Sequence, residues 1–194
     1  MRPVLRWTRW LLMACAVLLL GYCGFVLADT WVFQRAEDRR LESLVAAQAQ
    51  KAPSVSPASL SPAANGGLIG RVDVPRLGIS AIVMEGTGAF ILRRAVGHIR
   101  GTALPGQRGN IGISGHRDTF LRPLRRIETG DMILLTTMTG EYRYRVLATS
   151  IVAPDDVGVL DAGEGEILTL VTCYPFYFVG PAPNRFIVRA ERVS

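Results

Sequence analysis

The stretch EILTLVTC, residues 166–173, is an apolar run interrupted by two threonines, and it ends in a cysteine. Its length and its content of Ile, Leu, Val and Thr are typical of a β-strand. Tyr174, Pro175 and a loop rich in Gly and Pro follow at once, so the strand ends near the cysteine. A thiol at such a junction can face an open cleft while its backbone stays rigid.

Six other short apolar or alternating runs lie between residue 68 and the C-terminus, separated by turns that contain Gly or Pro. They are LIGRVDV (68–74), ISAIVM (79–84), NIGISG (110–115), DMILLTT (131–137), EYRYRVLATSIVA (141–153) and RFIVRAERV (185–193). Residues 89–95 and 119–127 are typical of short helices. This pattern predicts a mainly all-β domain over residues 68–194 with seven or eight strands. A closed barrel is favoured over a sandwich, because closure leaves no exposed strand edge.

The composition limits the classes of protein that fit. The chain has 194 residues, of which 49% are hydrophobic and 20% are charged, enough for one domain of ordinary size. Its 22 basic and 16 acidic residues give a net charge of +6. The arginines are dispersed rather than gathered in one stripe, so we do not expect a nucleic-acid partner.

The N-terminal segment has the properties of a membrane anchor. Residues 10–28 carry no charged side chain, and as a helix they would extend about 28 Å, close to the roughly 30 Å of a bilayer's hydrocarbon core. Arg2, Arg6 and Arg9 precede this run and Asp29 follows it. The positive-inside rule then predicts a single-pass protein of the cell membrane, with residues 1–9 in the cytoplasm and the folded domain outside. A cleaved signal peptide ending near Ala28 is the alternative, and the length of the apolar run favours the anchor.

Residues 29–67 connect this segment to the folded domain. Leu41, Leu44 and Val45 have helical spacing, which predicts a juxtamembrane helix over residues 31–45. From Ala46 to Gly67, 16 of 22 residues are Ala, Pro, Ser or Gly, which predicts a flexible tether.

The cysteines point to nucleophilic chemistry. Cys15 and Cys23 lie in the apolar N-terminal run, so the exported domain has Cys173 as a lone thiol without a disulfide partner. A lone exported thiol is liable to oxidation, which favours a reactive role over that of a small buried hydrophobe. Neither Cys nor His residues have the paired spacing of a zinc site, and we expect no metal and no cofactor.

A nucleophilic cysteine needs a base and a donor for the oxyanion. His116 follows the apolar run 110–115 at the start of a polar loop, and we favour it as the base over His98, which lies in a turn-rich stretch. Arg185 opens the last predicted strand, eleven residues after Tyr174, so the intervening loop can fold back and set it beside Cys173. Arg189 has the same strand face and is the rival candidate.

These residues carry a resemblance to a known family. TLVTC (169–173) resembles the Thr-Leu-x-Thr-Cys signature of the sortases, GHRDT (115–119) is similar to their histidine motif, and RFIVRA (185–190) is similar to the strand that bears their arginine. The three occur in the family's order, and residues 69–79 resemble the family's opening strands. The sequence around Cys173 is most similar to that of class D sortases.

The resemblance implies an eight-stranded barrel and a cysteine transpeptidase. In such enzymes the cysteine attacks the Thr carbonyl of a Leu-Pro-x-Thr-Gly-like sorting signal near the C-terminus of a secreted protein, and an amine of a peptidoglycan precursor or a pilin lysine resolves the thioacyl-enzyme. By this resemblance Cys173 is the nucleophile, His116 the general acid and base, and Arg185 the residue that stabilises substrate and oxyanion. Thr172 is a further candidate for substrate binding.

Two other functions remain open at this level. A membrane-tethered barrel could bind peptides without catalysis, and a cell-wall cysteine peptidase or L,D-transpeptidase could use the same residue types. The presence of Cys173, His116 and Arg185 together favours the transpeptidase.

Overall fold

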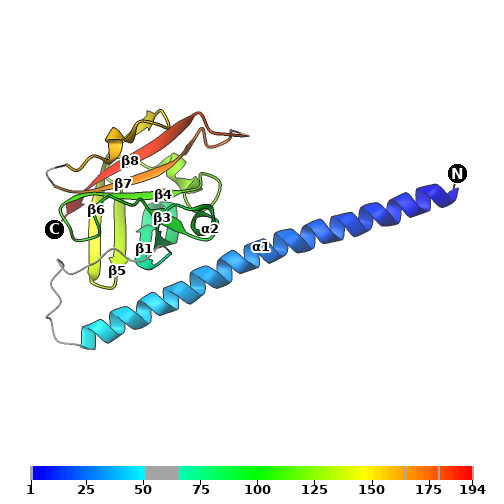
Figure 1. The fold of residues 1–194 in the computed structure, drawn as a ribbon, viewed down its shortest axis with the longest axis horizontal. Coiled ribbons are helices and arrows are strands. Elements are labelled where there is room, and N and C mark those ends of the chain that lie inside the picture. Colours follow the sequence, from blue (N-terminus) through cyan, green and yellow to red (C-terminus); the bar gives the residue numbers. More distant parts are fainter. Residues whose placement is uncertain (1, 51–65, 164, 179, 194) are drawn as a thin grey trace.

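The apolar runs form the strands of a closed β-barrel in the computed structural model (Figure 1). The structure describes residues 2–50, 66–163, 165–178 and 180–193. The strands are β1 (Leu68–Val74), β2 (Ile79–Glu85), β3 (Val96–His98), β4 (Gly109–Gly115), β5 (Met132–Thr137), β6 (Gly140–Val152), β7 (Glu166–Tyr174) and β8 (Asn184–Val193). Their order around the barrel is β1-β2-β3-β4-β7-β8-β6-β5, and β5 pairs with β1 to close it. The closed eight-stranded barrel predicted from the sequence is confirmed for the part of the chain that the structure describes.

Seven of these strands coincide with the predicted runs to within one or two residues, and β3 does not. The stretch around His98, interpreted as turn-rich and without a strand, forms three residues of β-structure that pair in parallel with β2 and antiparallel with β4. The sequence did not indicate β3, because a strand of three residues shows no periodicity. Short helical turns join the strands: η2 (Pro75–Leu77), α2 (Ala89–Leu92), η3 (Arg122–Arg126) and η4 (Val157–Leu160).

The barrel interior is filled by the inward-facing side chains of the strands. Val72, Ile113, Leu170 and Val188 all belong to this core and are essentially inaccessible to solvent. Burial alternates along β6, where Tyr142, Tyr144 and Val146 face inward and their neighbours face solvent. The two-residue period of a strand therefore explains which positions are apolar.

Strand β2 is buried on both faces, and the second face is covered by the N-terminal helix α1 (Arg2–Gln50). Ala81 and Val83 point into the barrel core, whereas Ile82 and Met84 point outward. Figure 1 shows the C-terminal half of α1 alongside the barrel and the N-terminal half projecting away from it. Leu41 of α1 packs into the outer cluster and is 1% exposed.

Polar contacts also hold this part of α1 on the barrel. Gln34 donates from Nε2 to the carbonyl of Arg94 at 2.6 Å, and its Oε1 accepts from the Ile82 amide at 3.0 Å. The Asp29 carboxylate accepts two hydrogen bonds from the Arg94 guanidinium, at 2.9 and 3.1 Å. We call residues 29–45 of α1 the docked segment.

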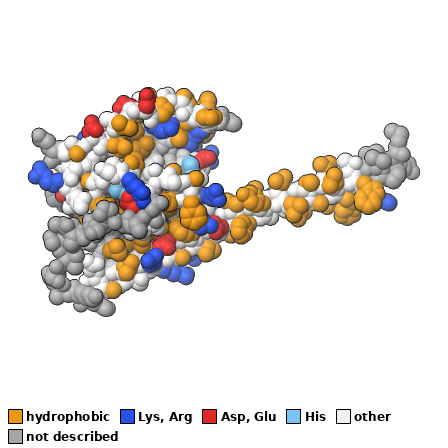
Figure 2. All heavy atoms as spheres, viewed as in Figure 1, with side chains coloured by type: hydrophobic (Ala, Val, Ile, Leu, Met, Phe, Trp, Pro, Cys, Tyr) orange, Lys and Arg blue, Asp and Glu red, His pale blue; other side chains and the backbone are white. Residues whose placement is uncertain are grey.

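The helix extends further than the sequence indicates. It runs without a break from the apolar segment through Gln50, so residues 46–50, expected to start a tether, are helical. The rest of the expected tether up to residue 65 lies outside the described residues. The stretch Arg6–Gln48 is long and apolar enough, by length and composition, to cross a membrane. Its projecting half exposes large apolar side chains such as Leu18 and Phe25 (Figure 2).

Candidate active site

The ends of three neighbouring strands bring the sequence-predicted residues to one edge of the barrel. Strands β4 and β7 are parallel, with Gly115 opposite Thr172, so their carboxyl ends meet at the same edge. His116 follows Gly115, and Cys173 follows Thr172. Adjacent strands lie about 4.8 Å apart, so the backbones of these two residues are neighbours.

Cys173 and Arg185 face each other across β7 and β8. These strands are antiparallel, and their register pairs Cys173 directly with Arg185. Leu168 and Leu170 point into the core, so alternation turns Cys173 to the outer face, where its free thiol is half-buried. Directly paired residues have their side chains on the same face, with Cβ atoms about 4.5–5.5 Å apart.

The two arginines of β8 that share this face differ in their distance from the thiol. Arg189 pairs with Thr169, four residues before Cys173, which places it about 13 Å further along the strand. Arg185 is half-buried, and its Nη1 donates to the carbonyls of Ala182 and Asn184 at 3.3 and 3.1 Å. These contacts hold the guanidinium at the level of Cys173.

Thr172, the residue before Cys173, lies on the inner side of β7. Its side chain is 2% exposed, points into the barrel, and donates a hydrogen bond of 2.8 Å to the carbonyl of Gly115. The substrate-binding role expected for Thr172 stays a prediction. The bond joins the residue before Cys173 to the residue before His116 and fixes the register of the two strand ends.

His116 is exposed at the start of the loop after β4. Gly115, which precedes it, allows this loop to sit close to the core, because a Cβ there would lie 2.8–2.9 Å from atoms of Leu121 and Val96. Leu121 is fully buried beneath the loop. The imidazole is therefore accessible while its backbone is tightly supported.

Arg117 ties this loop to the loop between β7 and β8. Its guanidinium donates to the carbonyls of Pro175, Phe178 and Gly180 at 3.1, 2.7 and 3.0 Å. One residue thus connects the segment that carries His116 with the segment that joins Cys173 to Arg185. The sequence gives no sign of this role for Arg117, because a loop arginine beside a candidate base has no pattern that reveals a partner 58 residues away.

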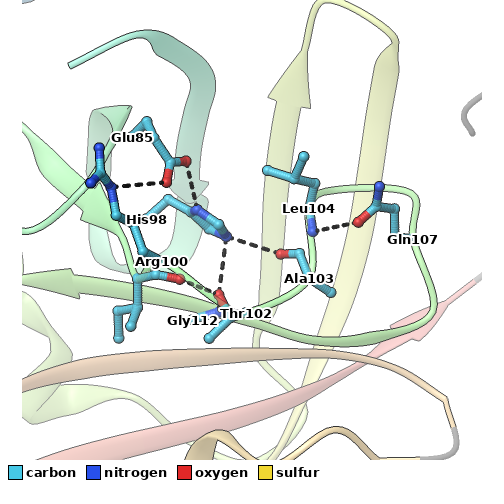
Figure 3. A network of polar contacts seen from close by, with 9 residues as sticks. Glu85, His98, Arg100, Thr102, Ala103, Leu104, Gln107 and Gly112 are labelled. Carbon is cyan, nitrogen blue, oxygen red and sulfur yellow. Dashed lines mark hydrogen bonds and ion pairs between the residues drawn. The ribbon is translucent and has the colours of Figure 1, made fainter. Parts of the chain in front are cut away.

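His98, the rival candidate for the base, is buried in a polar network inside the fold (Figure 3). Its Nδ1 lies 2.8 Å from a carboxylate oxygen of Glu85, and its Nε2 lies 3.0 Å from both the Ala103 carbonyl and the Thr102 hydroxyl. The carbonyl can only accept, so Nε2 is the donor in that hydrogen bond, and Nδ1 pairs with the carboxylate of Glu85. With both nitrogens occupied and the ring 2% exposed, His98 cannot exchange protons with a substrate.

Among the described residues no group of three or more His, Cys, Asp and Glu side chains could hold a metal ion. The edge offers a thiol, an imidazole and a guanidinium at the ends of adjacent strands, and these are the groups needed for nucleophilic acyl transfer.

Comparison with known proteins also indicates an enzyme that carries out nucleophilic acyl transfer. A Sortase domain family model matches residues 72–193. The chain is 34% identical to "Sortase D" of Bacillus subtilis over 94% of its own length and 96% of that protein. It is similar to the structure of a Sortase D5 transpeptidase from Clostridium perfringens, with a TM-score of 0.62 and 29% identity over 68% of this chain and 82% of that one.

A lid mutant of sortase A from Corynebacterium diphtheriae has the same TM-score of 0.62 and 28% identity, over 71% of this chain and 74% of that one. The class of protein that the closed barrel and the free Cys173 at its edge define is that of a cysteine transpeptidase. The chain belongs to the sortase family, whose members act in cell-wall sorting and are anchored in the membrane.

Proposed function

We propose that this sortase cleaves a C-terminal Leu-Pro-x-Thr-Gly-like signal of secreted proteins and joins the released carboxyl end to an amine of a peptidoglycan precursor or of a pilin lysine. The observation that carries the proposal is the strand register, which pairs Cys173 with Arg185 and Gly115 with Thr172. Side chains at the ends of three strands then meet at a peptide bound along the outer face of β7 and β8.

The reaction proceeds in two acyl transfers. The Cys173 thiolate attacks the Thr carbonyl carbon, and the Arg185 guanidinium donates hydrogen bonds to the oxyanion that forms. The C–N bond then breaks, and the leaving amine takes a proton from the His116 imidazolium, which leaves a thioester on Cys173. The incoming amine attacks this thioester and gives a proton back to His116, and the thiolate is released as the new amide forms.

The N-terminal segment bears on which side of the membrane the barrel lies. Arg2, Arg6 and Arg9 lie before the apolar run, which supports an orientation with the N-terminus in the cytoplasm and the barrel outside. Labelling of Cys173 by a membrane-impermeant maleimide on intact cells, in a Cys15→Ser/Cys23→Ser background, tests this orientation. Labelling that occurs only after lysis would contradict it.

Single substitutions in the full chain test the catalytic roles. Cys173→Ala abolishes both peptide cleavage and transfer to an amine, and His116→Ala removes both while alkylation of Cys173 continues. Arg185→Ala lowers kcat/KM for a sorting-signal peptide by about 10²–10³, the usual cost of losing an oxyanion donor.

Arg189→Ala is the matched control for Arg185, because it removes the same side chain from the same face of β8. It retains activity within a few fold. A large loss with Arg189→Ala and a small loss with Arg185→Ala would move the oxyanion role away from Arg185. Full activity of Cys173→Ala would refute the mechanism altogether.

A further inference from the structure

Aromatic side chains are exposed on the loops at the edge of the barrel that carries the candidate site. Phe90 on α2 is 67% exposed, and Tyr177 and Phe178 in the loop between β7 and β8 are 71% and 45% exposed. We call these side chains the exposed rings. Large apolar side chains that gather on one side of a domain mark a surface that contacts a protein or a membrane.

Each of the exposed rings has an arginine guanidinium over its face. The guanidinium carbons lie between 4.8 and 5.9 Å from the ring centroids, in the pairs Arg94 with Phe90, Arg125 with Tyr177 and Arg117 with Phe178. A ring with a cation above it combines an apolar body with a charged rim. Side chains of this kind are favoured at the boundary between the hydrocarbon core of a bilayer and its headgroups.

The loops next to the exposed rings are strongly basic. Residues 87–95 contain two arginines and residues 116–126 contain four, and the one acidic residue in these two stretches is Asp118. Arg93, Arg122 and Arg125 are exposed, and none of them forms an ion pair with a carboxylate of the described residues. By contrast, the connection between β6 and β7, residues 153–165, contains four acidic residues and no basic one. Figure 1 shows this connection on the side of the barrel away from α1.

The apolar run of α1 ends beside the same loops. Leu27, near the end of the run, lines one cavity together with Phe120 of the loop after β4. Asp29 binds Arg94, whose guanidinium lies over Phe90. Because α1 continues unbroken from the apolar run into the docked segment, these loops lie at the level where the run leaves a bilayer. Figure 1 shows the loop between β7 and β8 extending to the side toward which the N-terminal half of α1 projects, and Figure 2 shows hydrophobic and basic side chains next to one another where the helix leaves the barrel.

We propose that the active-site edge of the barrel docks on the membrane surface, with the exposed rings among the headgroups and Arg93, Arg122 and Arg125 against anionic lipid phosphates. A negatively charged bilayer surface attracts arginines that lie next to a span, and the attraction ends within a few ångströms of the surface. The span already holds this edge at the bilayer, so lipid is the partner that the edge meets whatever else is bound. Docking is then a second attachment besides the span, and Cys173 and His116 open at the level of the headgroups.

The test attaches one bimane fluorophore to the full chain, in a background without the natural thiols through Cys15→Ser, Cys23→Ser and Cys173→Ser. The label is placed at Phe90→Cys, at Tyr177→Cys or at the control Val157→Cys. These three side chains are 67%, 71% and 70% exposed, and Val157 lies on η4, away from α1. In nanodiscs of anionic phosphatidylglycerol, lipid with a nitroxide on its headgroup quenches the labels at positions 90 and 177 several-fold more strongly than the label at 157. Equal quenching at the three positions would overturn the proposal.

A second measurement separates docking on anionic lipid from mere nearness to the span. In nanodiscs of uncharged phosphatidylcholine, quenching at position 177 is several-fold weaker than in phosphatidylglycerol. Arg93→Gln/Arg122→Gln/Arg125→Gln lowers the ratio of docked to undocked protein in phosphatidylglycerol by about tenfold or more, because each arginine near an anionic surface favours the docked state. The control is Arg143→Gln/Arg145→Gln at the start of β6, which pairs with the end of β8 and so lies opposite to the active-site edge, and it leaves the ratio unchanged.

Thermal unfolding in the nanodisc shows that the arginine variants are folded, and both unfold at the temperature of the parent protein. If the triple variant unfolds at a lower temperature, the comparison of the two lipids decides alone. The proposal is overturned if quenching at position 177 is the same in both lipids, or if the two arginine variants change it equally. Because the labelled proteins lack the Cys173 thiol, neither result depends on the proposed function.

Discussion

Leu41 on α1 offers a direct test of whether the helix is part of the folded domain. Its side chain is 1% exposed and packs against Leu68, Ile82 and Met84 on the outer face of the barrel. Leu41→Ala removes the contacts that this side chain makes and leaves a cavity between helix and barrel. If the docked segment folds together with the barrel, the whole domain loses stability.

The size of the loss follows from the burial. Replacing a fully buried Leu with Ala costs about 2–5 kcal/mol, and a site at an interface between elements can partly collapse, so we expect about 3 kcal/mol. For a chain of this size 1 kcal/mol corresponds to about 2–4 °C in Tm, so the expected decrease is about 6–12 °C. Leu44 on the same helix is 37% exposed, and Leu44→Ala is the control with a decrease below about 2 °C.

Thermal unfolding of the full chain in detergent measures the decrease in Tm, and amide hydrogen exchange measures docking itself. The Ile82 amide donates to Oε1 of Gln34, so its protection depends on the helix lying on the barrel. Leu41→Ala accelerates exchange at Ile82, and Leu44→Ala does not. The reasoning is refuted if both variants unfold at the same temperature, or if the Ile82 amide of the wild-type protein exchanges as fast as an exposed one.

Three other substitutions test side-chain contacts elsewhere in the barrel and its loops. His98→Ala leaves Glu85 buried without its nearest partner, so it should cost about 3–5 kcal/mol in urea unfolding while kcat/KM per folded molecule is retained; a lost activity at unchanged stability would contradict this. Arg117→Ala frees the loop after β7 and should lower kcat/KM for the donor peptide by about 10–10² with little effect on Tm, whereas an unchanged kcat/KM would show that the loop needs no tie. The Arg76 guanidinium, which donates to the carboxylate of Asp131, lowers the pKa of Asp131, so this pair stabilises the fold above about pH 4 and its contribution fades as the pH falls through the depressed pKa. Asp131→Asn should therefore lower Tm at neutral pH and approach the wild-type Tm in acid, and a Tm difference independent of pH would contradict the pairing.

The strands were predictable because each of them carries its own pattern. The run in β7 and the alternation in β6 show strand periodicity over eight residues or more, and turns with Gly or Pro mark their ends. Strand β3 escaped because a three-residue strand is defined by its partners β2 and β4, and its own side chains add no pattern. The double-sided burial of β2 was visible as a continuous apolar run, but the run did not show what covers its outer face.

In the candidate site, too, some features were predictable from the sequence and others were not. Cys173, His116 and Arg185 stand in recognisable motifs at strand ends, so the sequence singled them out, and their catalytic roles stay predictions. The substrate-binding role of Thr172 also stays a prediction, and its motif did not show that its side chain faces the barrel interior and bonds to Gly115. Alternation along the strand would have indicated this, since Thr172 lies on the inward side with Leu170.

The order of residues alone determined the barrel class, the apolar span and the family, because each of these depends on patterns within a short window or on a motif. Tertiary structure alone decided that α1 lies on the barrel beside the site, that His98 is enclosed with Glu85, and that Arg117 joins two loops. Gln34 and Arg94 are 60 residues apart, and Arg117 and Pro175 are 58 apart. A hydrogen bond between such distant residues forms only after the chain has closed a long loop, and it leaves no periodic trace in the residues on either side.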